Sequence, residues 1–243
     1  MARRAVQGLK AGAVSSSAPF AVPALPVKGS AETYPVRRIY CVGRNYAEHV
    51  REMGGDPARE APFFFAKPPD AVVANGGDVP YPPRTTNLHH EVELVVAIGR
   101  GGSAIATGTA LEHVFGYAVG NDLTRRDLQA QQRAKGLPWE ISKGFDHSAP
   151  MTAVHPVALV GHPGRARIWL DVNGTRRQDA TLDQMVWSVA EIIAELSTFF
   201  RLERGDLIFT GTPAGIGPLV AGDAVHAGIE GFDDLRHRIV APR

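Results

Sequence analysis

Glu91 and Glu93 stand two residues apart in an apolar stretch, residues 89–98, which is rich in valine and is ended by Gly99. This composition predicts a β-strand. Side chains at positions i and i+2 of a strand leave on the same face, so the two carboxylates are expected roughly 6–7 Å apart. Two like charges in a half-buried sheet need a shared proton or a neutralising cation. The pair therefore indicates a metal site.

A third acid, Asp122, ends a second apolar stretch, residues 114–121, and is expected at the end of a neighbouring strand. Three carboxylates form a hard-cation site, which favours Mg²⁺ or Mn²⁺, with Ca²⁺ as a further choice, over Zn²⁺. The alternative is an edge strand whose acids face water, because solvent-facing strand positions are commonly charged.

A short predicted helix, residues 46–53, carries His49 and Glu52 three positions apart, so their side chains share a face and can form a hydrogen bond. A carboxylate that fixes an imidazole tautomer makes the histidine a better general base. The alternative is a solvated helix face. Lys143, next to Gly144 and Phe145, is a further candidate that could bind a carboxylate or stabilise an enolate, or could be an ordinary surface lysine.

The composition excludes several classes of protein. The chain has 243 residues, 44% of them hydrophobic, which is enough for a core without disulfides, and the formal net charge of +1 gives no reason to expect nucleic acid as a partner. Its single cysteine, Cys41, fits a small buried side chain and a reducing cytoplasm. Apolar stretches are all shorter than the ~20 residues that a membrane span needs, so no membrane association is expected.

The order of the predicted elements indicates an α+β fold of mixed β-sheets with few short helices. Residues 1–35 contain prolines and basic residues and are expected to form a flexible arm, rather than a targeting segment, before a catalytic domain over 36–243. Asn173-Gly174 predicts a β-hairpin. Apolar residues recur along residues 182–200 at helical spacing, which predicts one long amphipathic helix. The glycine-rich residues 210–218 after a buried strand predict a tight turn that exposes backbone N–H groups.

Six ordered sequence blocks carry a resemblance to a known family. They are "CVGRNYAEHVREMG" (41–54), "PFFFAKPPDAV" (62–72), "LHHEVELVVAIG" (88–99), "GYAVGNDLTRRDLQ" (116–129), "KGLPWEISKGFDHSAP" (135–150) and "GDLIFTGTPAGIGP" (205–218). The chain resembles the fumarylacetoacetate hydrolase superfamily in its acylpyruvate hydrolase branch, and within it is most similar to bacterial fumarylpyruvate hydrolases.

The resemblance implies a role for each matching residue. Glu91, Glu93 and Asp122 match the ligands of a Mg²⁺ or Mn²⁺ ion. His49 and Glu52 match a water-activating dyad, carried on a segment that closes over substrate in relatives. The lysine that meets the substrate or its enolate matches Lys143, and the positions that line the keto-acid pocket match Arg44, Lys67, Arg126, Gln129 and Thr212. Asn121 departs from the family pattern, where Leu or Cys is common before the last ligand.

The implied reaction is hydrolysis of a carbon–carbon bond in a 2,4-dioxo acid, with fumarylpyruvate, from gentisate degradation, as the expected substrate. Its second carboxylate needs a cationic anchor, for which Arg44, Arg125 and Arg126 remain open. Two alternatives remain open: oxaloacetate decarboxylation or keto-acid isomerisation at the same site, and binding of a keto acid without catalysis. The resemblance also implies a homodimer.

Overall fold

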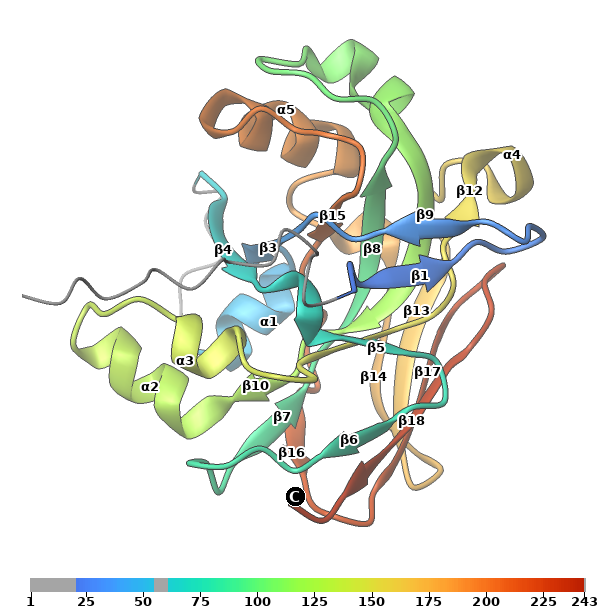
Figure 1. The fold of residues 1–243 in the computed structure, drawn as a ribbon. Helices are drawn as coiled ribbons and strands as arrows, with labels where there is room; N and C mark the ends of the chain where they lie inside the picture. Colours follow the sequence, from blue (N-terminus) through green and yellow to red (C-terminus); the bar gives the residue numbers. More distant parts are fainter. Residues whose placement is uncertain (1–20, 55–60, 243) are drawn as a thin grey trace, which may run out of the picture.

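The β-strands of the chain form four sheets, as a computed structural model shows for residues 21–54 and 61–242 (Figure 1). The largest is a mixed sheet in the order β4-β3-β15-β8-β9-β11-β5, with β12 beside β9. Its strands are β3 (Arg38–Gly43), β4 (Phe63–Lys67), β5 (Val72–Ala74), β8 (Val92–Ile98), β9 (Val114–Asn121), β11 (Ala149–Met151), β12 (His155–Pro156) and β15 (Asp206–Phe209).

Three smaller sheets complete the β-structure. A five-stranded sheet, in the order β14-β13-β17-β18-β6, consists of β6 (Asp78–Pro80), β13 (Arg167–Val172), β14 (Thr175–Thr181), β17 (Ala224–Ile229) and β18 (Leu235–Val240). The predicted hairpin at Asn173-Gly174 joins β13 to β14, and both residues have the positive φ, 52° and 77°, that such a turn requires. The other two sheets contain β7 (Leu88–His90), β10 (Thr124–Arg125) and β16 (Gly217–Leu219), and β1 (Ala24–Pro26) and β2 (Thr33–Pro35).

Strand β8 is buried on both faces. Leu94 and Val96 belong to a core shared with the five-stranded sheet and α5 (Val189–Phe199), whereas Val95 and Ala97 belong to a second core beneath the β1–β2 hairpin. A strand covered on both sides is apolar along its length rather than alternating. The expected α+β fold of packed mixed sheets is confirmed.

The apolar stretch around the two glutamates is not one strand. β7 ends at His90 and β8 begins at Val92, and the two strands belong to different sheets, so Glu91 lies at the break. The reason is that the N–H of Glu91 donates to the side-chain Oδ1 of Asn121 at 2.8 Å rather than to a neighbouring strand. The continuous strand predicted over residues 89–98 is therefore wrong at this residue.

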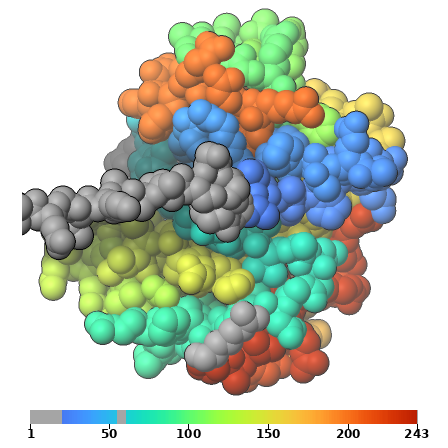
Figure 2. Space-filling view, viewed as in Figure 1, coloured from blue at the N-terminus to red at the C-terminus, as the bar shows by residue number. Residues whose placement is uncertain are grey.

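The N-terminal segment differs from the predicted flexible arm. Residues 1–20 of that arm lie outside the described residues, but β1 and β2 form a hairpin that buries Leu25 and Tyr34 against the large sheet. The Tyr34 hydroxyl donates to the carbonyl oxygens of Ile98 and Asp206. Residues 24–35 are therefore part of the folded body, and the hairpin forms part of its surface in blue (Figure 2).

Helices are few and short. Besides α5 they are α1 (Ala47–Glu52), α2 (Arg126–Ala134), α3 (Glu140–Lys143) and α4 (Val157–Val160), with 3₁₀ turns at Pro69–Ala71, Thr107–His113 and Leu182–Gln184. The helix predicted over residues 182–200 starts only after Ser188, because Ser188 and Glu191 form a capping box. Among the described residues, no helix is long and apolar enough to span a membrane.

The glycine-rich segment after β15 passes under the loop that follows β3. Gly211 has φ +98°, and a Cβ atom added to it would lie 2.6 Å from the Cβ of Asn45. Its N–H donates to a Glu93 carboxylate oxygen at 2.7 Å. Only glycine combines this backbone conformation with so close an approach.

Replacing Gly211 by Ala should destabilise the protein more than replacing Gly222 by Ala. Both residues have φ near +100°, but a Cβ at Gly222 meets no atom within 4 Å. Gly222→Ala should therefore lose only the conformational term, about 1–2 kcal/mol, and Gly211→Ala about 1–3 kcal/mol more from the contact with Asn45. Urea unfolding of both variants measures the difference, and equal losses would contradict it.

Candidate active site

Three buried carboxylates meet where β8 and β9 lie side by side. Val92 pairs with Asn121 in the ladder, so the neighbouring Glu91, Glu93 and Asp122 are brought together. One carboxylate oxygen from each acid lies within 4.8 Å of the others, and none of the three residues is more than 4% exposed. β8 is an internal strand of the sheet. The alternative of an edge strand with water-facing acids is therefore excluded.

Three cations neutralise two of these acids. Lys143 Nζ lies 2.7 Å from Glu91 Oε2 and 2.6 Å from Asp122 Oδ2, and Lys67 Nζ lies 2.8 Å from Asp122 Oδ1. Arg126 also pairs with Glu91. Burial alone would raise the pKa of Glu91, but the charges of Lys143 and Arg126 outweigh it and hold the pKa well below its usual range.

Glu93 is the acid that forms no ion pair with a cation in residues 21–54 and 61–242. Of the described residues, only the N–H of Gly211 donates to its carboxylate. Burial, together with the charges of Asp122 and Glu91, raises its pKa well above the usual range. Asp122 Oδ1 is buried and, despite the nearby Lys67, receives no aligned hydrogen bond from the described part of the chain. An uncompensated carboxylate beside an oxygen lacking a donor fits a divalent cation with oxygen ligands.

His49 and Glu52 form the expected pair on α1. His49 Nδ1 lies 3.2 Å from Glu52 Oε2, and Glu52 Oε1 accepts the N–H of Gly215 at 3.1 Å. Although burial opposes it, these hydrogen bonds lower the pKa of Glu52. Because a carboxylate can only accept from Nδ1, the other imidazole nitrogen is left with its lone pair. Residues 55–60, which continue this segment, lie outside the described residues.

One cavity of about 430 Å³ joins the acids and the histidine. The glycine-rich segment contributes to it through Thr212, whose hydroxyl is already held between Val92 and Gln178. Lys67 is buried behind the cavity, where it also donates to the carbonyl oxygens of Leu123 and Lys143. The predicted site residues that line the cavity are Arg44, His49, Glu91, Glu93, Asp122, Arg126, Gln129, Lys143 and Thr212.

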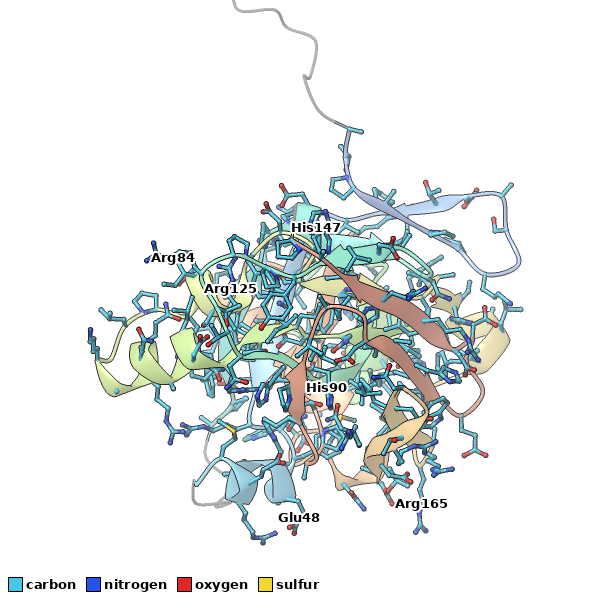
Figure 3. All side chains as sticks on the ribbon, turned by 90° about the horizontal axis from the view of Figure 1, so that it is seen from below. Glu48, Arg84, His90, Arg125, His147 and Arg165 are labelled. Atoms are coloured by element: carbon cyan, nitrogen blue, oxygen red, sulfur yellow. The ribbon has the colours of Figure 1, made fainter. Side chains whose placement is uncertain are left out.

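Arg125 is not part of this cavity. Its guanidinium lies over the Phe145 ring at 4.5 Å and lines a second cavity together with His147. Figure 3 labels Arg125 and His147 in the upper half of the view and Glu48 of α1 near the bottom. Arg126 does line the first cavity, but it is paired with Glu91 and also donates to Gln129. Of the three arginines left open as anchors, Arg44 alone lines the cavity without an acidic partner among the described residues.

Two polar residues that support the acids, Asn121 and Gln178, were not among the predicted site residues, although Asn121 stood out as a departure from the family pattern. Asn121 accepts the N–H of Glu91 and donates to His237 Nε2 at 3.0 Å. This residue, which departs from the family pattern, therefore links Glu91 to the five-stranded sheet through hydrogen bonds. Gln178 accepts from the Val92 N–H at 3.1 Å and from His90 Nδ1 at 3.0 Å. Gln178 lies in β14, far from the acids in sequence, so no local pattern could reveal it.

Comparison with known proteins agrees with the geometry. Residues 38–240 match the family described as fumarylacetoacetate (FAA) hydrolase C-terminal. The chain is 44% identical over 181 residues to a fumarylpyruvate hydrolase of Ralstonia sp, covering 74% of this chain and 93% of that protein. It is 43% identical over 203 residues to the mouse protein oxaloacetate tautomerase FAHD1, mitochondrial, covering 84% and 91%.

Solved structures give the same result. The crystal structure of fumarylpyruvate hydrolase from Pseudomonas aeruginosa, in complex with Mn²⁺ and pyruvate, is 52% identical, has a TM-score of 0.91, and covers 94% of this chain and all of that one. With its sheets, its acidic cluster and the match over residues 38–240 taken together, the chain belongs to the fumarylacetoacetate hydrolase family.

Proposed function

We propose that this protein is a metal-dependent hydrolase that cleaves the carbon–carbon bond of an acylpyruvate, with fumarylpyruvate as the substrate and fumarate and pyruvate as the products. The observation that carries the proposal is the single cavity that contains both the three-carboxylate cluster and the buried His49 paired with Glu52. A cluster alone could bind a keto acid, whereas hydrolysis also needs a base that activates water.

Glu91, Glu93 and Asp122 would hold the cation, Mg²⁺ or Mn²⁺, with Ca²⁺ as a further choice. When bound, such an ion supplies Lewis-acid polarisation of the substrate's carboxylate and enol oxygens. Two observations support this assignment: no cation of the described residues forms an ion pair with Glu93, and Asp122 Oδ1 receives no aligned hydrogen bond there although Lys67 lies beside it.

His49 takes the proton from water, and Glu52 stabilises the imidazolium that forms. The water oxygen attacks the carbonyl carbon farther from the pyruvyl carboxylate, and the bond between that carbon and the methylene group breaks. The electron pair goes to pyruvate enolate, which then takes up a proton. The ammonium of Lys143, which lies between Glu91 and Asp122, stabilises the enolate oxygen.

The remaining pocket residues bind and orient the substrate. Arg126 and Gln129 are hydrogen-bonded to each other on the cavity-facing side of α2, and Arg44 and Thr212 line other parts of the wall. Lys67 acts from behind by holding Asp122. Several such contacts hold the substrate in a fixed orientation beside the catalytic groups. The reaction then proceeds as if it were intramolecular.

The relatives named oxaloacetate tautomerase favour a second candidate function, the isomerisation of a keto acid through the same enolate. Oxaloacetate decarboxylation would use that enolate too. Decarboxylation needs no activated water, so the His49–Glu52 pair supports hydrolysis over it. Tautomerisation can use the same pair as a base for proton transfer, and the comparison of substrates separates it from hydrolysis. We also propose that the protein acts in aromatic catabolism, in the cytoplasm and as a homodimer, the last of which light scattering tests.

Replacing His49 by Ala should lower kcat for fumarylpyruvate about 10²–10⁴-fold, because a positioned general base contributes that much. Glu52→Gln should lower kcat less, since it keeps a polar side chain beside His49 and removes only the negative charge of Glu52. Glu48 lies on the same helix with its side chain 71% exposed, so Glu48→Gln is the matched control. Loss of enol absorbance with Mn²⁺ present measures the rate. Full hydrolysis by His49→Ala would contradict the role.

The raised pKa of Glu93 predicts that the stability of the metal-free protein depends on pH. A carboxyl whose pKa is raised by folding stabilises the protein at acidic pH, and this stability is lost as the pH rises through the folded-state pKa. The metal-free wild type should therefore lose stability relative to Glu93→Gln as the pH rises above the usual carboxyl range, by up to about 1.4 kcal/mol per pH unit. Denaturant unfolding at several pH values measures this.

Added Mn²⁺ should reverse that order, stabilising the wild type and having little effect on Glu93→Gln, because a ligand that binds only the folded state raises its stability. Parallel pH curves for the two metal-free proteins, or equal stabilisation by Mn²⁺, would argue against Glu93 as a ligand.

Assays with oxaloacetate separate the two candidate functions. The metal-loaded protein should release fumarate and pyruvate from fumarylpyruvate with a higher kcat/KM than it shows for oxaloacetate, and His49→Ala should strongly lower the rate of this hydrolysis. If the wild type acts on oxaloacetate alone, the hydrolase function is replaced. Activity that survives His49→Ala then assigns decarboxylation, and activity that is lost with His49 assigns tautomerisation, which needs a base.

A further inference from the structure

The cavity contains a cation that neither the acids nor the resemblance accounts for. Arg133 lines it together with Arg44, Arg126 and Lys143. Lys143 and Arg126 are paired with the carboxylate cluster. Arg133 has no acidic partner among the described residues, and its one hydrogen bond there runs from Nη1 to the carbonyl oxygen of Met53 at 3.3 Å. A guanidinium has five N–H donors, so as far as the described residues go, most donors of this group are available to a ligand.

We propose that Arg133 binds the carboxylate at the far end of the substrate and so selects acylpyruvates whose acyl group carries a negative charge. This inference rests on the proposed hydrolase function and deepens it by naming the class of substrate. A planar guanidinium and a carboxylate form paired, charge-assisted hydrogen bonds, which a neutral acyl group cannot replace.

Helix α2 sets the distance between the two ends of the cavity. Four residues of this helix line the cavity, at the i, i+3, i+4 and i+7 spacing of one helix face: Arg126, Gln129, Ala130 and Arg133. Arg126 contacts Glu91 at the metal cluster, and Arg133 begins two turns later, about 10 Å along the axis. The pyruvyl half belongs at the cluster, so the acyl half extends along α2 toward Arg133.

Fumarylpyruvate has the length that this arrangement requires. Six carbon–carbon bonds separate its two carboxyl carbons, and an extended chain advances about 1.2 Å per bond, so they lie about 7 Å apart. With one carboxylate at the cluster, the other reaches within range of a flexible arginine side chain on the second turn. Acetylpyruvate ends in a methyl group and leaves Arg133 without a partner.

Arg44 is the competing anchor. It also lines the cavity and has no acid beside it among the described residues, but its guanidinium lies 5.7 Å from the centre of the Phe63 ring. It extends from the loop after β3 rather than from α2, and the family resemblance already gives it a general pocket role. On the cavity-facing side of α2, Arg133 follows Arg126 and Gln129 in the direction away from the cluster.

Steady-state kinetics of the Mn²⁺-loaded protein with fumarylpyruvate and acetylpyruvate test the proposal. Arg133→Met should lower kcat/KM for fumarylpyruvate about tenfold to a hundredfold, mainly through KM, because a hydrogen-bonded charge pair is lost. The value for acetylpyruvate should stay within about twofold, since nothing contacts its methyl end there. Arg133→Lys should recover part of the loss, because it keeps the charge without the paired geometry.

Lys135→Met is the control. It changes an exposed cation at the end of α2 outside the cavity, and should leave kcat/KM unchanged for both substrates.

Equal losses for both substrates, or no loss for either, would overturn the proposal. So would a fumarylpyruvate-selective loss in Arg44→Met but not in Arg133→Met, which assigns the anchor to Arg44. If the wild type cleaves neither substrate, the proposed function fails, and calorimetric binding of fumarylpyruvate to His49→Ala with and without Arg133→Met then decides the anchor. Weaker binding in the double variant supports it, and unchanged binding rejects it.

Discussion

The arrangement of the molecule follows from the need to hold three carboxylates together in its interior. Like charges this close are unstable unless cations neutralise them, and Lys143, Lys67 and Arg126 do so for Glu91 and Asp122 but not for Glu93. The three cations come from β4, α2 and α3, so those elements are drawn to one end of β8 and β9. The cluster is therefore both the binding site and a reason for the packing around it.

Backbone irregularities serve this cluster. At the break between β7 and β8, the N–H of Glu91 is bound by Asn121, so the two glutamates are fixed by different partners. The positive φ of Gly211 turns its N–H toward Glu93. An unbroken strand through Glu91, or a loop without the positive φ at Gly211, would leave these acids exposed or without donors. The strand break and the positive φ therefore occur at the site itself.

Short-range patterns predicted the parts of the site, and long-range contacts completed it. The spacing of Glu91 with Glu93, and of His49 with Glu52, is visible in a few residues of sequence. The strand break at Glu91 depends on Asn121, and the support of His90 depends on Gln178, which lies 88 residues away. The predicted arm up to residue 35 was wrong over its last part because the apolar side chains of Leu25 and Tyr34 are a weak signal until their partners are known.

The two halves of the site are held with different strength. The acids sit on paired strands in the interior, whereas His49 sits on α1, a six-residue helix without a side-chain cap at its start. So short a helix depends on tertiary contacts, and the Glu52 contact with Gly215 is one of them. A change in α1 can therefore move the base without disturbing the acids, which separates enolate binding from water activation. One fold can support relatives named for hydrolysis and relatives named for tautomerisation in this way.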